Sequence, residues 1–424
     1  MLNGESTIYS LHENTKRVLA SLSKIPTAGA VLRKIPVTTR FKTQILGGKV
    51  TDEGVLDGDL YLKGGADPGF VSETMWVLVN NLSRSGLKHV KGNIVVDDTL
   101  FDKNYISDSR QNVRVDRAYD APVSAMSFNW NSVNICVRPG EGAGKDARVV
   151  LDPPNKYVQL VNNAKTSKDG SKLNISVERK PVEPFGDRLE VNGTIPVGYG
   201  EKIIYKNISS PTLWSGYNLQ AFLDQRGIKV DGSVRDGKVG GNSEVLAEVE
   251  SWPLSSIVSD MMKFSSNYVA EMLTKHLSGP SEDKVGNMKE GLDRIREFIA
   301  DAGVSKSDFV FDSPSGFNRN NQMSAKDLAK VLESIRDDFR LYPEFLTSLP
   351  ISGYDGTLKN RMTSPNVQGW VRAKTGMLNG VIGLAGFAGR KSGQVLTFVF
   401  IYNGSADMYK VRDFFDNLSE TLVL

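Results

Sequence analysis

Histidine and cysteine are scarce in this chain, and their scarcity excludes several kinds of site. The single cysteine, Cys136, can form neither an intrachain disulfide nor a cysteine-based zinc site. The three histidines, His12, His89 and His276, are far apart and show no HExxH spacing. None lies near a GxSxG sequence, which argues against a Ser–His–Asp triad. We therefore expect no metal and no cofactor, and any hydrolytic chemistry must use another base.

Long apolar runs and an excess of charge of one sign are also missing. No segment has about 18 consecutive apolar residues, so we expect no transmembrane segment. The 52 lysines and arginines nearly balance the 49 aspartates and glutamates, which argues against a nucleic-acid partner. The first residues, MLNGESTIYS, contain neither the basic region nor the apolar core of a signal peptide. The sequence thus fits a cytoplasmic protein or one whose leader has been removed.

The composition is that of a globular protein with more than one domain. Hydrophobic residues make up 40% of the 424 residues and charged residues 24%, which fits about two to three domains. Both ends of the chain read as mixed α/β. Residues 257–277 show an apolar helical stripe, residues 369–402 predict strands, and residues 406–424 predict an amphipathic helix.

The middle of the chain has a different pattern. From about residue 41 to residue 250, short β-like runs are separated by Gly, Asp and Asn, which predicts an inserted β-rich region and not a helical one. Within it, residues 137–199 are richer in polar Gly/Pro turns and are expected to form a subdomain of their own.

A serine nucleophile without histidine needs another base, and a lysine can serve if burial or neighbouring charge lowers its pKa. Ser21 and Lys24 lie three residues apart in a helix-like run that reaches Leu32, so they share one helical face. A helix N-terminus also favours developing negative charge. The S-x-x-K pattern alone is weak evidence for a catalytic pair. Ser281 and Lys284 have the same spacing, and such a pattern more often indicates an N-cap serine beside a solvated lysine.

A second pattern, Ser265-Ser266-Asn267, lies in the predicted helix at 257–277. Ser265 takes a position where the stripe is otherwise apolar, and a buried hydroxyl there needs a partner. A serine that bonds back to its own helix is the simpler interpretation. Ser127 and Ser132 begin S-x-N sequences as well, so this pattern is also common by chance.

A third pattern, Lys374-Thr375-Gly376, closes a predicted strand. A glycine there lets a ligand approach the strand closely, and the lysine supplies positive charge for a carboxylate. The similar KSG sequence at 391–393 falls in a predicted hairpin turn, where glycine is expected in any case.

Three such patterns in this order and setting are much more specific than any one of them. Here the chain resembles the penicillin-recognising serine enzymes, and among them the penicillin-binding protein 4 type of D-alanyl-D-alanine carboxypeptidase/endopeptidase, the S13 serine peptidases. The supporting strings run through most of the chain: GDLYLKGGADP, APVSAMSFNWNSV, MMKFSSNYVAEML, DSPSGFNRNNQMSA, LPISGYDGTLKNRM and VRAKTGMLNGVIGLAGF. The long gap between Ser21 and Ser265 fits this group's large insertion.

The resemblance implies an α/β (α+β) transpeptidase/β-lactamase-like domain that is split by a large inserted β-rich domain. Residues 1–40 and 251–424 would form the catalytic domain. Residues 41–136 and 200–250 would form the insertion, and residues 137–199 its nested β subdomain.

The resemblance also implies roles for the first two motifs. Ser21 would be the acylated nucleophile and Lys24 its general base, kept partly neutral by Lys374 and by burial. Ser265 and Asn267 would relay a proton to the leaving amine and orient the substrate amide.

The third motif would bind the substrate. Lys374 and Thr375 would hold its terminal carboxylate, and the strand containing Gly376 would pair with the extended peptide. The backbone N–H of Met377, with that of Ser21, would form the oxyanion hole, and each donor contributes about 3–4 kcal/mol. The best candidate for an acidic substrate contact from the insertion is Asp116, although an ordinary turn aspartate is the simpler interpretation.

Two residues near the nucleophile depart from the family's pattern. Leu19 stands where the family usually has proline, and Pro26 falls in the second turn of the predicted helix, where it could produce a kink.

The function implied is that of a penicillin-sensitive serine DD-peptidase. Its substrates would be peptidoglycan stem peptides or cross-links, β-lactams would be covalent inhibitors, and its location would be the periplasm or cell envelope. A β-lactamase or esterase on the same machinery is one alternative, although no glutamate stands out as the activator of a deacylating water. A non-catalytic β-lactam-binding or wall-binding protein is another.

Overall fold

The computed structural model describes residues 2–3, 6–113, 115–182 and 186–423. The chain forms two compact units, each assembled from separated stretches. Unit 1 contains Met1–Thr39, Ile106–Val113 and Trp252–Leu424, and unit 2 contains Arg40–Tyr105 and Arg114–Ser251. In the described part of the chain, no helix is both long and apolar enough to cross a membrane.

The sheet of unit 1 is built mainly from the C-terminal part of the chain. Strands β20 (Val371–Leu378), β21 (Val381–Gly389) and β22 (Val395–Asn403) pair antiparallel in sequence order. Two short strands, β1 (Leu2–Asn3) and β2 (Ser6–Thr7), follow β22, and β20 is the opposite edge strand. Strand β21, between β20 and β22, is buried at all but its last residue, which is why its sequence is apolar without alternation.

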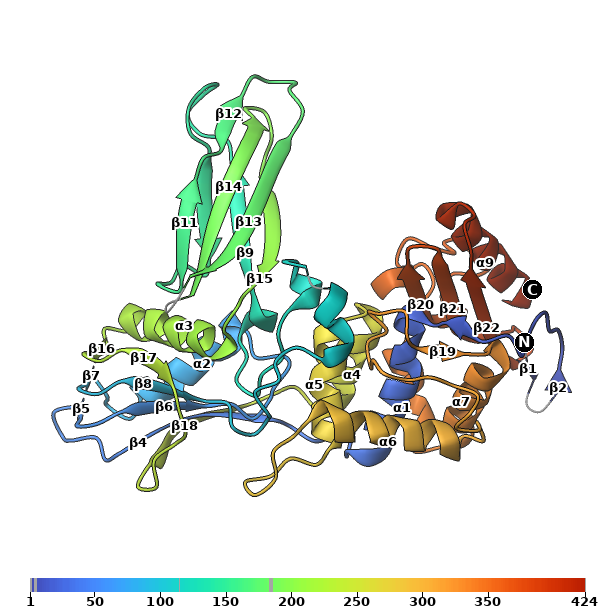
Figure 1. The fold of residues 1–424 in the computed structure, drawn as a ribbon, viewed down its shortest axis with the longest axis horizontal. Helices are drawn as coiled ribbons and strands as arrows, with labels where there is room; N and C mark the ends of the chain where they lie inside the picture. The colour runs from blue at the N-terminus through green and yellow to red at the C-terminus, as the bar shows by residue number, and fades with distance from the viewer. Residues whose placement is uncertain (1, 4–5, 114, 183–185, 424) are drawn as a thin grey trace. The chain divides into compact units, whose positions relative to one another are not determined.

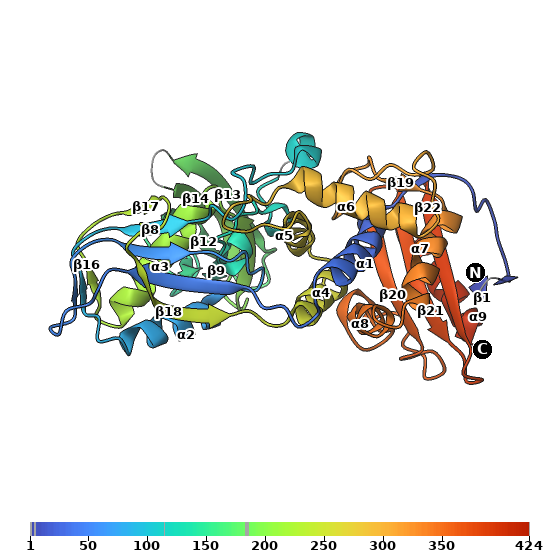
Figure 2. The ribbon, with the colours of Figure 1, turned by 90° about the horizontal axis from the view of Figure 1, so that it is seen from below.

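Helices cover both faces of this sheet (Figures 1 and 2). On one face, the Phe400 ring, beside Leu384 in the register, lies 5.4 Å from the Phe415 ring of α9 (Met408–Val423). On the other face, Phe387 contacts Tyr342 of α8 (Tyr342–Ser348) with ring centroids 5.4 Å apart. Adjacent residues of a strand point to opposite faces, so β21 is enclosed on both sides.

The remaining elements of unit 1 are mostly helical. They are η1 (Ala20–Ser23), α1 (Lys24–Lys34), η2 (Asp108–Val113), α4 (Leu254–Lys263), α5 (Asn267–Leu277), α6 (Met288–Asp301), α7 (Ala325–Asp337) and η5 (Gly356–Leu358), with the paired short strands β3 (Arg17–Val18) and β19 (Gln322–Met323).

Pro26 lies in an earlier turn of its helix than the sequence predicted. Because η1 precedes α1, Pro26 is the third residue of the α-helix and not a residue of its second turn. The N–H groups of the first turn have no partner within the helix, so proline is tolerated there.

Unit 2 is β-rich, as the sequence indicated. Its strands are β4 (Lys42–Gly47), β5 (Val55–Leu56), β6 (Leu60–Lys63), β7 (His89–Val90), β8 (Ile94–Asp97), β9 (Ser132–Arg138), β10 (Arg148–Asp152), β11 (Val158–Asn162), β12 (Lys165–Ser167), β13 (Asn174–Val182), β14 (Gly186–Pro196), β15 (Lys202–Asn207), β16 (Lys229–Val230), β17 (Val234–Asp236) and β18 (Glu244–Glu250). The largest sheet has the order β17-β8-β6-β4-β18, and β11-β14-β12 with β13 form a second one.

Unit 2 also contains helices that the β-like punctuation did not predict. These are α2 (Ser72–Ser83), α3 (Pro211–Gln225) and the short η3 (Ala118–Asp120) and η4 (Asn129–Asn131). The predicted subdomain at 137–199 shares its core with the rest of the unit. Tyr157, inside that range, lies with its ring centroid 5.5 Å from that of Trp214 on α3, and both belong to one buried cluster.

The segment 106–113 differs from the predicted domain boundaries. The sequence interpretation placed it in the insertion, whereas the structure places it in unit 1. The reason is a buried contact: Nη2 of Arg110 donates to Oε2 of Glu271 on α5 over 2.8 Å. The carbonyl of Ser109 also accepts a hydrogen bond from the side chain of Asn318.

Candidate active site

Ser21 lies in the middle of the 3-10 turn η1. The turn begins at Ala20, which has a positive φ of 48°, and the Ser23 hydroxyl donates to the Ala20 carbonyl over 2.8 Å. Ser21 is half-buried, while Lys24, the first residue of α1, is completely buried. The three-residue spacing therefore does bring the two side chains together, across the junction of two helix types.

Two facing glycines let η1 lie directly against the sheet. Gly376 of β20 pairs with Gly383 of β21. A Cβ atom on Gly376 would lie 2.9 Å from the Leu19 carbonyl oxygen, and one on Gly383 would lie 2.6 Å from Leu22. The glycine of the K-T-G motif thus makes room for the serine-bearing turn. The sequence had suggested that it makes room for a ligand.

Lys24 is held by three acceptors. Its Nζ lies 3.3 Å from Oγ of Ser21, 2.8 Å from Oδ1 of Asn267 and 2.7 Å from the carbonyl oxygen of Ser315. Burial, and next the positive charge of Lys374, hold the pKa of Lys24 well below its usual value, and Glu271 acts in the opposite direction. A lysine in this state can accept a proton from a neighbouring hydroxyl.

The S-x-N motif lies at a break between two helices. The sequence predicted one helix over 257–277, but α4 ends at Lys263 and α5 begins at Asn267. Ser265 has a φ of 57°, and Ser266 caps α5 by accepting from the N–H of Val269 over 3.3 Å. The break turns Ser265 and Asn267 toward the two lysines of the site.

Lys374 occupies a second buried position. Its Nζ donates to Oγ of Ser265 over 2.8 Å and to the carbonyl oxygen of Thr375 over 2.9 Å. Burial lowers the pKa of Lys374 to about 7. Each serine of the site thus has a lysine with a lowered pKa beside it, Lys24 at Ser21 and Lys374 at Ser265.

The residues after Lys374 lie at the edge of the sheet. Oγ1 of Thr375 donates to Oγ1 of Thr357 over 2.9 Å, and the side chain of Met377 is 66% exposed. Residues 350–352 bond to β20 at Val371 and Ala373, before the motif. Among the described strands, none pairs with the outer edge of β20 at 374–378.

The loop that contains Ser315 belongs to the site, although no sequence pattern had predicted a role for it. Asn321 anchors the loop: its Oδ1 accepts from the N–H groups of Asp312 and Ser313, and its Nδ2 donates to Oγ of Ser23. Gly316 has a φ of 69°, and a Cβ there would lie 1.8 Å from the Ala20 carbonyl oxygen. The sequence feature that could have revealed this role is the DSPSGFNRNNQMSA string, which served only as support for the family resemblance.

Asp116 belongs to unit 2. There its carboxylate accepts a hydrogen bond from Nζ of Lys206, a nearly buried residue of β15. The neighbouring backbone is fixed to the same strand, because Asn207 donates to the carbonyl oxygens of Val115 and Asp120. These contacts describe an anchored loop, and a substrate role for Asp116 stays a prediction.

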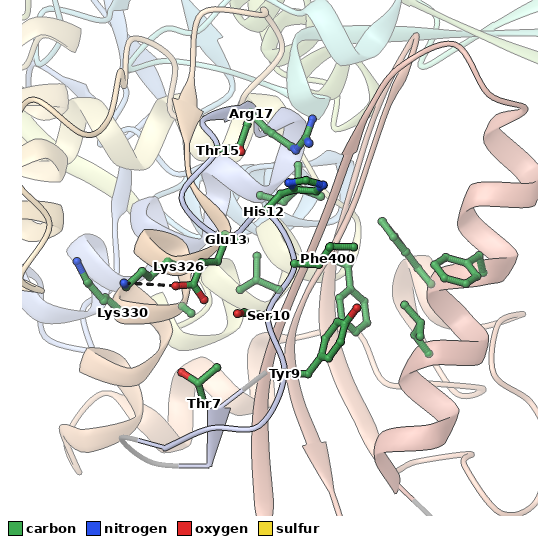
Figure 3. A pocket seen from close by; sticks show the side chains of 18 residues that line it. Thr7, Tyr9, Ser10, His12, Glu13, Thr15, Arg17, Lys326, Lys330 and Phe400 are labelled. Carbon is green, nitrogen blue, oxygen red and sulfur yellow. Dashed lines mark hydrogen bonds and ion pairs between the residues drawn. The ribbon is translucent and has the colours of Figure 1, made fainter.

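A cavity of about 380 Å³ in unit 1 is not lined by any predicted site residue. It lies between the segment 7–17, α7, β22 and α9, and Figure 3 shows Tyr9, His12, Glu13, Lys326 and Phe400 around it. Within the described ranges, no group of three or more His, Cys, Asp or Glu could hold a metal ion.

Comparison with known proteins shows which family the chain belongs to. The model of the D-Ala-D-Ala carboxypeptidase 3 (S13) family matches residues 2–422. The chain belongs to this family. The S13 resemblance inferred from the three motifs is thereby confirmed.

Curated S13 relatives align with almost the whole chain. A D-alanyl-D-alanine carboxypeptidase of Actinomadura sp. (strain R39) is 29% identical over 412 residues, covering 94% of this chain and 75% of the relative. The D-alanyl-D-alanine carboxypeptidase DacB of Haemophilus influenzae is 24% identical over 428 residues, covering 95% and 84%. The expected class of enzyme, a serine-type D-Ala-D-Ala carboxypeptidase, is supported by the family and these relatives.

Solved structures confirm the expected fold. Penicillin-binding protein 4 of Haemophilus influenzae superposes with a TM-score of 0.82 at 23% identity, covering 98% of this chain and 93% of that one. A predatory peptidoglycan endopeptidase of Bdellovibrio bacteriovorus gives 0.57 at 16% identity, covering 98% and 88%. The mixed α/β fold with a β-rich insertion is that of the penicillin-recognising proteins.

Proposed function

We propose that this S13 protein is a serine DD-peptidase that acts on the D-alanyl-D-alanine ends or cross-links of peptidoglycan peptides through an acyl-enzyme at Ser21. The observation that carries the proposal is the 3.3 Å contact between Nζ of Lys24 and Oγ of Ser21. It supplies a base beside the serine in a site without a histidine. The family match over residues 2–422 supports the substrate class.

Acylation begins with a proton transfer. Neutral Lys24 accepts the proton of the Ser21 hydroxyl, and Oγ attacks the carbonyl carbon of the scissile D-alanyl bond. The negative charge that forms on the carbonyl oxygen would be stabilised by the backbone N–H groups of Ser21 and Met377, each contributing about 3–4 kcal/mol. The lowered pKa of Lys24 favours this step because it increases the neutral fraction of the amine.

Collapse of the tetrahedral intermediate breaks the amide bond. The leaving amine needs a proton, and Ser265 is placed to relay one because its hydroxyl contacts Nζ of Lys374. Asn267 already bonds Lys24 through Oδ1, so its amide nitrogen can donate to the substrate's carbonyl group. Water then hydrolyses the ester and restores Ser21.

The open edge of β20 suits an extended peptide. Substrate strands that pair with residues 374–378 would gain main-chain hydrogen bonds, as in β-augmentation. Thr375 and Lys374 would receive the terminal carboxylate at the end of this strand. Asp116, in unit 2, is proposed as a substrate-binding residue because the family resemblance implies an acidic contact from the insertion.

β-Lactams would act as covalent inhibitors of the same serine. A solved structure of the Haemophilus influenzae penicillin-binding protein 4 contains a β-lactam. Peptidoglycan lies outside the cytoplasm, so the proposed working location is the periplasm or cell envelope.

Intact-protein mass spectrometry with benzylpenicillin tests the proposal. A persistent single adduct is expected on the wild type and on Ser281→Ala, the chance S-x-x-K match, and none on Ser21→Ala. A transient adduct with rapid drug turnover would favour a β-lactamase. Absence of any adduct on the wild type, or an adduct that survives in Ser21→Ala, would contradict the proposal.

A further inference from the structure

We propose that Arg110 and Glu271 form a positioning pair that keeps Lys24 available as the general base, because Arg110 holds the Glu271 carboxylate away from a direct ion pair with Lys24. The inference rests on the role given to Lys24 under the proposed function. It assigns a task in catalysis to the segment 106–113, which the chain sends into unit 1 between two stretches of unit 2.

The pair is buried within unit 1. Nη2 of Arg110 donates to Oε2 of Glu271 over 2.8 Å, and each side chain is only 1% exposed. The Ser109 carbonyl, next to Arg110 in the chain, accepts from the side chain of Asn318, three residues after Ser315. The arginine is thus delivered by a segment that is bonded to the loop holding Lys24.

Two paths connect Glu271 with Lys24. Asn267 and Glu271 lie four residues apart on α5, on one helical face, and Asn267 accepts from Nζ of Lys24. Ser315 provides the other path: its Oγ lies 3.5 Å from Oε1 of Glu271, and its carbonyl oxygen accepts from Nζ of Lys24 over 2.7 Å. The two carboxylate oxygens therefore face different partners, Oε2 toward Arg110 and Oε1 toward the Lys24 loop.

The charges around Lys24 oppose one another. Burial and Lys374, from β20, lower the pKa of Lys24, whereas Glu271, from α5, raises it. The groups contributed by η1 and by the 313–316 loop, Ser21 and the Ser315 carbonyl, are uncharged. A carboxylate in a direct buried ion pair with Lys24 would keep the amine protonated, and a protonated amine cannot accept the serine proton. An arginine stays charged at any working pH, so Arg110 offsets that carboxylate permanently.

Fold stability alone is a weak reason for such a pair. Buried ion pairs replaced by neutral residues of similar volume often leave stability unchanged or raise it, because the two charges lose their hydration. A charged pair in this position has an electrostatic effect on the ionisable neighbour Lys24, and a neutral pair would lack that effect.

The test is the pH dependence of acylation by benzylpenicillin, followed by intact mass from about pH 5 to about pH 10. Arg110→Met removes the positive charge that offsets the Glu271 carboxylate, so the acid limb should move up by about one pH unit, and acylation below that limb should be about tenfold slower. Glu271→Gln should move the limb down. The double variant should fall between the two, and Arg110→Lys should restore most of the wild-type profile.

Opposite displacements by the two single variants are the signature of the proposed pair. Equal losses at every pH in both variants would overturn it and leave only a structural role. Arg361→Met removes the cation of another ion pair of unit 1, with Asp416, and should not move the limb. If Arg110→Met fails to fold, as judged by thermal melting, Glu271→Gln and the double variant decide the question. A wild type that is never acylated would contradict the proposed function itself, which is a separate outcome.

Discussion

Oγ of Ser265 accepts a 2.8 Å hydrogen bond from Nζ of Lys374, so the second and third motifs of the site meet directly. Ser265 can reach Lys374 because α4 ends at Lys263 and the backbone turns through a positive φ of 57° before α5 begins. A continuous helix at 257–277 would have no such turn at this point. The break between the helices is therefore part of the site.

Replacement of Ser265 by alanine should slow acylation while leaving the fold intact. The variant removes the hydroxyl proposed to relay a proton to the leaving amine, and proton transfer by a placed side chain contributes about 10²-fold or more. Ser266→Ala is the matched control, because Ser266 only caps α5 and its loss should cost about 1 kcal/mol of stability with acylation retained. Stopped-flow acylation rates and melting temperatures of both variants provide the measurement, and similar acylation rates would argue against the relay.

Lys24→Arg should be almost inactive even though it keeps a positive charge. Arginine does not lose its proton in proteins, so it cannot accept one from Ser21. We expect acylation to fall by about 10²–10⁴-fold, the range for loss of a general base. Lys284→Arg, at the chance S-x-x-K match, should acylate like the wild type. Acylation of Lys24→Arg at more than about a tenth of the wild-type rate would show that another group is the base.

Lys374→Met should stabilise the protein at neutral pH and do so less at high pH. The pKa of Lys374 is lowered from 10.5 to about 7 in the folded state, so between these values the unfolded state binds more protons. The free energy of unfolding of the wild type thus rises with pH across this window. Lys374 therefore destabilises the folded state most near pH 7, the lower end of the window. At about 1.4 kcal/mol per pKa unit the gain in free energy of unfolding has an upper bound of about 5 kcal/mol, before the two lost hydrogen bonds are considered.

Melting temperatures of the wild type and of Lys374→Met at about pH 7 and about pH 10 test this expectation. The difference between the two proteins should shrink at the higher pH. A difference that does not change with pH would mean that the buried amine is already charged in the folded state.

Gly376→Ala should impair acylation through the turn that contains Ser21. A Cβ there would lie 2.9 Å from the Leu19 carbonyl oxygen, which is backbone and cannot rotate away. Overpacking of this kind costs about 1–3 kcal/mol, and here it would push η1 off the sheet. Gly241→Ala, where a Cβ would meet nothing within 4 Å, is the control. Equal acylation rates of these two variants would show that the turn tolerates the displacement.

The strands near the C-terminus could be predicted from the sequence because their pattern has a local cause. The predicted strands at 369–402 correspond to β20, β21 and β22, and the apolar sequence of β21 reflects its burial on both faces. The helix break at Ser265 could not be predicted in this way. Met261 and Tyr268 are both buried, so the apolar stripe continues across a break that it does not record.

The contacts around the site residues could not be predicted from local sequence patterns either. Ser315 reaches Lys24 from 291 positions away, and Glu271 reaches Arg110 from 161 positions away. No spacing rule connects residues at such separations, and only the folded chain brings them together.

In unit 2, helix α3 was not predicted because its buried face contains a serine, an asparagine and a glycine beside its apolar residues. These polar and small residues weaken the helical period of the apolar pattern.

The acceptors of Lys24 also bear on when the enzyme becomes reactive during synthesis. Ser21 and Lys24 leave the ribosome early, but Asn267, the Ser315 carbonyl and Lys374 follow much later in the chain. Until those residues are made, Lys24 is an ordinary solvated ammonium group and Ser21 an ordinary alcohol. The nascent chain therefore carries the proposed nucleophile in an unreactive form, and reactivity is expected only when the last strands have joined the first helix.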